Sequence, residues 1–139
     1  MRTRLVLAVL PVALIGVTAA TSMAAPKEMK GTFNAAASPD PSATAGEVCQ
    51  GVSPAGRFEV PLKVPTAGKL AVELTGYVGD WDLTLENKSG AILAQSAGFE
   101  VPVESFSVKF KKATEVVIVA CNFVGGPTAK GSFVFTPNK

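Results

Sequence analysis

The sequence predicts an all-β domain, a small sandwich of about seven or eight antiparallel strands, and three observations support this. Short segments in which apolar and polar residues alternate follow one another from residue 47 to residue 139. Gly, Pro, Asn and Ser separate these segments at about the spacing of a sandwich, and no segment there keeps a helical period. The chain has 139 residues and no histidine, so it lacks the commonest general base and metal ligand of proteins.

The alternation first becomes regular in residues 57–64, which predicts a strand with one apolar and one solvated face. Pro61 in its interior cannot donate a backbone hydrogen bond, so we expect this strand at a sheet edge or a bulge. Six further strands are predicted at residues 69–75, 80–86, 91–94, 105–111, 115–121 and 131–135. The segment 115–121 is apolar at successive positions, which indicates a central strand covered on both faces.

The segment before these strands has a different composition. Residues 25–46 contain three prolines, many small residues and only two large apolar side chains. Such a stretch buries too little apolar surface to offset its conformational entropy. We therefore predict a disordered linker here, followed by the sandwich domain at residues 47–139. The alternative is a strand at residues 29–34 that docks on the domain, although Gly31 would weaken it.

The first 24 residues have the pattern of a secretory signal peptide. A short basic segment at residues 1–4 precedes an apolar run at residues 5–20, and small residues follow up to Ala24. We predict cleavage after Ala24, because cleavage after Ala25 would leave Pro26 as the first residue. An uncleaved anchor is the alternative, but the apolar run of 16 residues is shorter than the ~20 that a membrane span needs.

Secretion changes the charge balance. The full chain has 13 basic and 11 acidic residues, a formal net charge of +2. Cleavage after Ala24 would remove Arg2 and Arg4, which leaves 11 basic residues against 11 acidic ones. A neutral protein has no long-range field that attracts polyanions. We therefore expect a secreted, extracellular monomer whose partner is neither nucleic acid nor a membrane.

The chain has two cysteines, Cys49 and Cys121. In an oxidising compartment an even cysteine count indicates a disulfide, and two cysteines allow one pairing. Closing a loop of this length would stabilise the fold by up to about 4 kcal/mol in the chain-entropy model. The alternative is two free thiols.

The stretch Gly79–Ser96 resembles the core of the bacterial pre-peptidase C-terminal domain. An Asp-x-Asp-Leu-x-Leu strand at residues 80–85, a turn ending in Gly90 and an Ala-x-Ser segment at residues 94–96 occur in the order typical of that family. The flanking segments 68–74, 115–120 and 132–135 are similar to its neighbouring strands. The resemblance implies a jelly-roll-like β-sandwich of the kind attached to secreted proteases and other hydrolases. The cysteine pair departs from the family pattern.

Asp80 and Asp82 are the candidate metal ligands. They lie two residues apart in a predicted strand, so both carboxylates project from one face. The resembled family includes calcium-binding members, such as the collagen-binding domains of clostridial collagenases, and this pair could share a calcium ion with oxygens from Glu47, Glu100 or loop carbonyls. The alternative is that both are solvated, outward-facing side chains. A glycosidase is not predicted, because a small sandwich strand offers no evident cleft between two carboxyl groups.

Tyr77 and Trp81 are the only Tyr and Trp of the chain, and glycines flank them. Exposed aromatic side chains at such a corner could stack on a sugar or a peptide, which makes them candidate binding residues. The alternative follows from the strand period, because Trp81 shares its parity with Leu83 and Leu85 and would then lie in the core.

Together these features predict a secreted, non-catalytic binding or accessory module for an extracellular polymer or a secreted protein. A partner, inhibitor or folding helper of a secreted hydrolase is the alternative. A stand-alone hydrolase is a third interpretation, disfavoured because a chain without histidine lacks the usual Ser-His-Asp and Cys-His arrangements. We expect no organic cofactor, and calcium is the metal that the carboxylates suggest.

Overall fold

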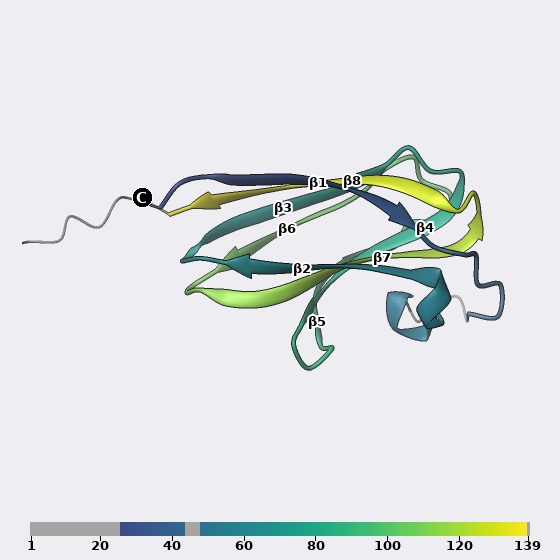
Figure 1. The fold of residues 1–139 in the computed structure, drawn as a ribbon, viewed down its shortest axis with the longest axis horizontal. Helices are drawn as coiled ribbons and strands as arrows, with labels where there is room; N and C mark the ends of the chain where they lie inside the picture. Colours follow the sequence, from purple (N-terminus) through teal and green to yellow (C-terminus); the bar gives the residue numbers. More distant parts are fainter. Residues whose placement is uncertain (1–25, 44–47, 139) are drawn as a thin grey trace, which may run out of the picture.

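The computed structural model describes residues 26–43 and 48–138, and the signal peptide expected at residues 1–24 lies outside them. The described residues form eight strands and two short 3-10 helices (Figure 1). Neither helix of this described part is long and apolar enough to cross a membrane. The elements in chain order are β1 (Met29–Ala36), η1 (Val48–Gly51), η2 (Pro54–Gly56), β2 (Arg57–Val64), β3 (Gly68–Thr75), β4 (Gly79–Asn87), β5 (Ile92–Ser96), β6 (Glu104–Phe110), β7 (Thr114–Gly125) and β8 (Thr128–Pro137).

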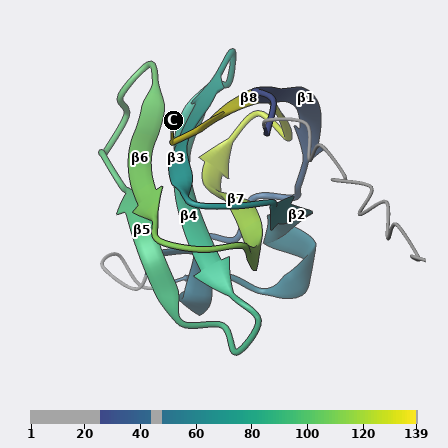
Figure 2. The ribbon, with the colours of Figure 1, turned by 90° about the vertical axis from the view of Figure 1, so that its left-hand side faces the viewer.

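The strands form two four-stranded antiparallel sheets, so the predicted all-β sandwich is confirmed. One sheet has the order β1-β8-β3-β6 and the other the order β2-β7-β4-β5. Figure 2 shows these two layers from one end of the molecule. Strand β2 lies at a sheet edge, as Pro61 predicts, and β7 lies between β2 and β4.

Strand β1 contradicts the prediction of a disordered linker at residues 25–46. It pairs along its whole length with β8, so the alternative of a docked N-terminal strand is correct here. Gly31 does not weaken this pairing, because the Phe133 ring covers it, and the Phe33 ring covers Gly131 in the same way. A Cβ atom at either glycine would overlap the ring of its partner. Each glycine therefore makes room for an aromatic side chain of the neighbouring strand.

The core lies between the two sheets and follows the predicted alternation. Inward-facing residues of β3 and β4 are buried, including Leu70, Leu74, Leu83 and Leu85, each with no exposed surface. Trp81 is also fully buried, and it is the largest side chain of this core. The alternation of apolar and polar residues thus predicts which face of these strands is buried.

A second, smaller apolar cluster covers the outer face of β7. Val119 and Cys121 point away from the main core and pack with Val52 and Cys49. Cys49 and Cys121 form the predicted disulfide, with their Cα atoms 5.4 Å apart. This confirms that β7 is covered on both faces, and it fixes η1 against the outer side of the sheet.

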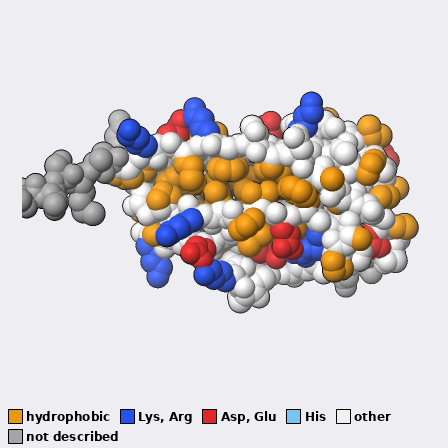
Figure 3. Space-filling model, in the orientation of Figure 1, with side chains coloured by type: hydrophobic (Ala, Val, Ile, Leu, Met, Phe, Trp, Pro, Cys, Tyr) orange, Lys and Arg blue, Asp and Glu red, His pale blue; other side chains and the backbone are white. Residues whose placement is uncertain are grey.

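Hydrophobic side chains form a band between β1 and β2, the neighbouring edges of the two sheets (Figure 3). The Phe33 and Phe58 rings stack across this edge, with centroids 6.1 Å apart and an interplanar angle of 14°. Met29, Val60 and Leu62 are also partly buried against the core. Side chains, rather than backbone hydrogen bonds, therefore close the sandwich on this side.

Candidate functional site

Asp80 and Asp82 project from the outer face of β4, as predicted, but Asp82 is largely buried. It is 7% exposed, and Thr84 and Glu86 on the same face are buried as well. The disulfide holds η1 against β4 and β7, and this segment covers part of the outer face. The interpretation of Asp82 as a solvated, outward-facing side chain is therefore wrong.

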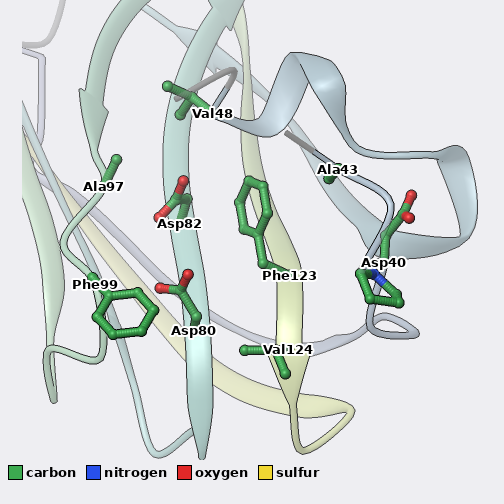
Figure 4. Close-up of a pocket in the computed structure, with 10 residues that line it drawn as sticks. Asp40, Ala43, Val48, Asp80, Asp82, Ala97, Phe99, Phe123 and Val124 are labelled. Atoms are coloured by element: carbon green, nitrogen blue, oxygen red, sulfur yellow. The ribbon is translucent and has the colours of Figure 1, made fainter. Parts of the chain in front are cut away.

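A pocket of about 410 Å³ lies at one end of this outer face, a size within the range of small-ligand sites (Figure 4). It is formed by β4, the end of β7, the loop between β5 and β6, and the segments on either side of residues 44–47. The described residues that line it are Asp40, Pro41, Ala43, Val48, Asp80, Asp82, Ala97, Phe99, Phe123 and Val124.

A β-bulge shapes the floor of the pocket. Asp80 pairs with Val124, whereas the next residue, Trp81, pairs with Asn122. Phe123 is therefore an extra residue without a partner on β4. Because the bulge interrupts the alternation of β7, Phe123 and Val124 both line the pocket beside the carboxylates.

The carboxylates of β4 differ in whether a cation or a hydrogen-bond donor of the described residues contacts them. Glu86 accepts hydrogen bonds from the Arg57 guanidinium at 3.2 and 3.3 Å, and Thr84 donates to it at 3.4 Å. No described residue donates a hydrogen bond to the Asp82 carboxylate or forms an ion pair with it. Oδ1 of Asp80 is buried and has no partner among the described residues. The negative charge of the pocket is thus uncompensated within this part of the chain.

The pKa values of Asp82 and Asp40, two carboxyl groups that line the pocket, are shifted in opposite directions. Burial, together with the charges of Asp80 and Glu104, raises the pKa of Asp82 to about 7. Hydrogen bonds from Ser42 and Ser53 hold the pKa of Asp40 well below its ordinary value. Asp40 is therefore ionised at neutral pH, while Asp82 changes its charge there.

Glu104 is a functional candidate that the sequence did not suggest. It occupies the inward register of β6 and has no exposed surface. Its Oε1 accepts a hydrogen bond from the Gly98 N–H at 2.8 Å, and no described residue donates to its Oε2. The available signal was its parity with Phe106 and Val108, which places a carboxylate in line with core residues.

Tyr77 and Trp81 do not line this pocket, and they differ in burial, since Tyr77 is half-buried and Trp81 is in the core. Trp81 has no exposed surface, and its indole N–H donates to the Gly126 carbonyl at 3.1 Å. The interpretation of Trp81 as a stacking residue is therefore wrong, and its core alternative is correct. The Tyr77 hydroxyl donates to the Val101 carbonyl at 2.8 Å, and burial with the nearby charge of Glu104 raises the pKa of Tyr77 to about 12.

The candidate calcium ligands are only partly brought together. Glu100 is exposed and does not line the pocket, and Glu47 lies outside the described residues. Within residues 26–43 and 48–138, no three His, Cys, Asp or Glu side chains converge so that they could hold a metal ion. Asp80 and Asp82 alone supply fewer than the 6–8 oxygens that calcium takes, so calcium binding stays a prediction that needs further oxygens, such as loop carbonyls.

Fold and site define a small disulfide-bonded β-sandwich with an acidic pocket at one end. No protein-family model and no curated protein matches the chain. Among solved structures it is similar to the pre-peptidase C-terminal domain of a collagenase from Bacillus anthracis, with a TM-score of 0.44, 9% identity, and 78% of this chain and 87% of that chain covered. That domain belongs to the family that Gly79–Ser96 resemble.

A viral protein is also similar in structure. It is the VP2 subviral particle of infectious bursal disease virus, with a TM-score of 0.39 and 16% identity over 92% of this chain and 37% of that chain. With both identities so low, the similarity concerns the arrangement of strands and not a ligand or partner.

Proposed function

We propose that the protein is a secreted, non-catalytic β-sandwich module that binds an extracellular polymer or another secreted protein through the pocket beside β4. The uncompensated Asp82 carboxylate carries this proposal. A buried charge without a partner destabilises a fold, and such groups concentrate at functional sites. The Cys49–Cys121 disulfide supports an oxidising compartment, in agreement with the predicted signal peptide.

The rim of the pocket supports a binding role. Of the residues that line it, Phe99 is 76% exposed and Val124 is 49% exposed. Val78, which accepts a backbone hydrogen bond from Gly126 near the end of β7, is 75% exposed. Large apolar side chains that gather in the open around a pocket mark interaction sites more often than scattered ones do.

A hydrolase is the second candidate, because a carboxyl group with a pKa near 7 suits a general acid. The composition of the pocket favours binding over catalysis. Apart from the carboxyl groups, no described lining residue has a side chain that donates a hydrogen bond. Stabilising a developing negative charge or orienting a sugar hydroxyl requires such donors. A screen of the purified protein against generic glycoside and ester substrates tests this candidate, and turnover lost in Asp82→Asn would support it.

The binding proposal is tested by retention. Immobilised protein is incubated with culture medium, and free protein with insoluble cell wall, chitin and collagen. We expect wild type to retain a secreted protein or a polymer, and the Phe99→Ala/Asp82→Asn variant to lose it. Glu73→Gln, which removes an exposed carboxylate on β3 in the other sheet, is the matched control. Capture of a secreted hydrolase would favour the partner, inhibitor or folding-helper role, and equal retention by all three proteins contradicts a role for the pocket.

A further inference from the structure

We infer that the pocket binds the cationic side chain of a lysine or arginine presented by a polypeptide, an inference that rests on the proposed function of this site. The Asp80 and Asp82 carboxylates receive the cation. The apolar rim around Phe99 receives the alkyl part of that side chain and the neighbouring residues of the polypeptide.

The fold already contains one buried carboxylate of β4 that is paired with a cationic side chain. On the outer face of β4, Glu86 is 6% exposed and is bound by the guanidinium of Arg57. Asp82, on the same face and four residues earlier, is 7% exposed and has no cation among the described residues. An unpaired carboxylate at this depth is destabilising, whereas a paired one is tolerated. A cation from outside would do for Asp82 what Arg57 does for Glu86.

The two free carboxylates are placed to share one cation. Their side chains point to the same side of β4, between Phe99 and Phe123 (Figure 4). The buried Oδ1 of Asp80 has no described hydrogen-bond partner. A guanidinium carries five N–H donors and an ammonium three, so a single side chain can donate to both carboxylates. None of the described lining residues is basic, so none competes for this position.

The aromatic walls suit the remainder of such a side chain. Lysine and arginine bury their alkyl stems along apolar surface, and their charged ends favour aromatic faces. Phe123 forms one wall, and Phe99, 76% exposed, stands at the opposite side of the carboxylates. Val78, which is 75% exposed, lies against Gly126, two residues after the rim residue Val124. Apolar surface exposed near the pocket favours a polypeptide, whose neighbouring residues can cover it, over a small free amine.

A divalent metal ion fits the same site less well. The described residues bring no third carboxylate, cysteine or histidine into ligating position. A metal ion would also leave the exposed apolar rim without a role. Calcium is therefore the competing occupant that an experiment must separate from an organic cation.

Calorimetric titration of the disulfide-bonded protein tests the inference. The probes are four end-blocked peptides that differ at one central residue, Lys, Arg, Gln or Glu, flanked by leucines. We expect the Lys or Arg peptide to bind about tenfold more tightly than the Gln peptide, because charge-assisted hydrogen bonds are stronger than neutral ones. Asp82→Asn should abolish this preference, and Asp80→Asn should weaken it. Glu73→Gln should leave it unchanged.

The outcomes separate the inference from the proposed function. Equal binding of the Lys, Arg and Gln peptides overturns the inference, and so does calcium binding that Asp82→Asn removes while no peptide binds. If no basic peptide binds but Asp82→Asn still releases a retained polymer, the function of the pocket stands and the cationic ligand is wrong. If neither peptides nor retained partners respond to Asp82→Asn or Phe99→Ala, the proposed function fails as well.

Discussion

Gly79 on β4 and Gly125 on β7 lie directly opposite each other and both have positive φ angles, 96° and 112°. A Cβ atom on Gly79 would overlap the Val124 carbonyl oxygen, and one on Gly125 would overlap the Val78 carbonyl oxygen. The two backbones thus approach more closely than side chains allow. This contact sits next to the bulge that brings Phe123 to the pocket.

Replacing either glycine by alanine should therefore destabilise the protein and disturb the pocket. The left-handed backbone and the overlap with a carbonyl oxygen together predict that Gly79→Ala lowers the free energy of unfolding by about 2–4 kcal/mol. Chemical denaturation measures this change. Gly90→Ala is the matched control, because Gly90 also has a positive φ of 81° but a Cβ there meets nothing within 4 Å. An equal loss in both variants would show that the close approach contributes nothing.

The disulfide is expected to stabilise both the fold and the cover of the pocket. Cys49→Ala/Cys121→Ala should lower the free energy of unfolding by about 2–4 kcal/mol, because the unfolded chain gains freedom over a long loop. Reduction of the wild type should give a similar loss. Alkylation with and without prior reduction, followed by mass spectrometry, checks the bond. Equal mass shifts under the two conditions would falsify its presence.

How much of this structure the sequence predicts depends on the kind of contact involved. Alternation predicts the strands from β2 to β8 and the burial of Trp81, because the side-chain period of a strand is a local property. Pro61 predicts a sheet edge because proline has no backbone N–H to donate, which is also a local property. The expected secretion into an oxidising compartment predicts the Cys49–Cys121 disulfide.

The contacts that were missed depend on partners far away in the sequence. Gly31 counts against β1 when it is considered alone, and only the Phe133 ring from β8 explains it. Asp82 is buried because η1 lies against β4, and the alternation of residues within β4 gives no information about a segment that packs on it. Alternation assumes that polar side chains face outward and that every residue of a strand has a partner. Glu104 breaks the first assumption because its carboxylate faces inward, and Phe123 breaks the second because it lies in a bulge.

Removing the Arg57 guanidinium should leave Glu86 as an unpaired buried charge. Arg57→Met is expected to lower the free energy of unfolding by about 2–4 kcal/mol, because breaking a buried pair from one side strands the other charge. Adding Glu86→Gln should recover part of this loss, since the amide carries no charge. Denaturation of the two single variants and the double variant measures the coupling. Strictly additive losses would show that the ion pair is not coupled in the folded protein.

Asp82 should make the stability of the protein fall as the pH rises toward neutrality. Its pKa is raised from an ordinary value of 3.8 to about 7 by burial and by the charges of Asp80 and Glu104. Below the lower value the carboxyl is protonated in both states, and it imposes no penalty. Between the two values the unfolded chain has released the proton and the folded chain retains it, so the free energy of unfolding falls by at most about 1.4 kcal/mol per pH unit. The loss levels off as the pH passes through the folded-state value near 7.

Asp82→Asn isolates this effect, because an amide of the same shape does not titrate. The variant should gain stability relative to wild type as the pH rises from about 4 to 7 and keep a constant advantage above that range. Urea denaturation at several pH values between these limits measures the difference. Asp40, whose pKa is lowered, titrates below this window and does not obscure it. A difference that stays constant with pH would mean that Asp82 has the same pKa in the folded protein as in the unfolded chain, so that its position in the pocket would not penalise its charge.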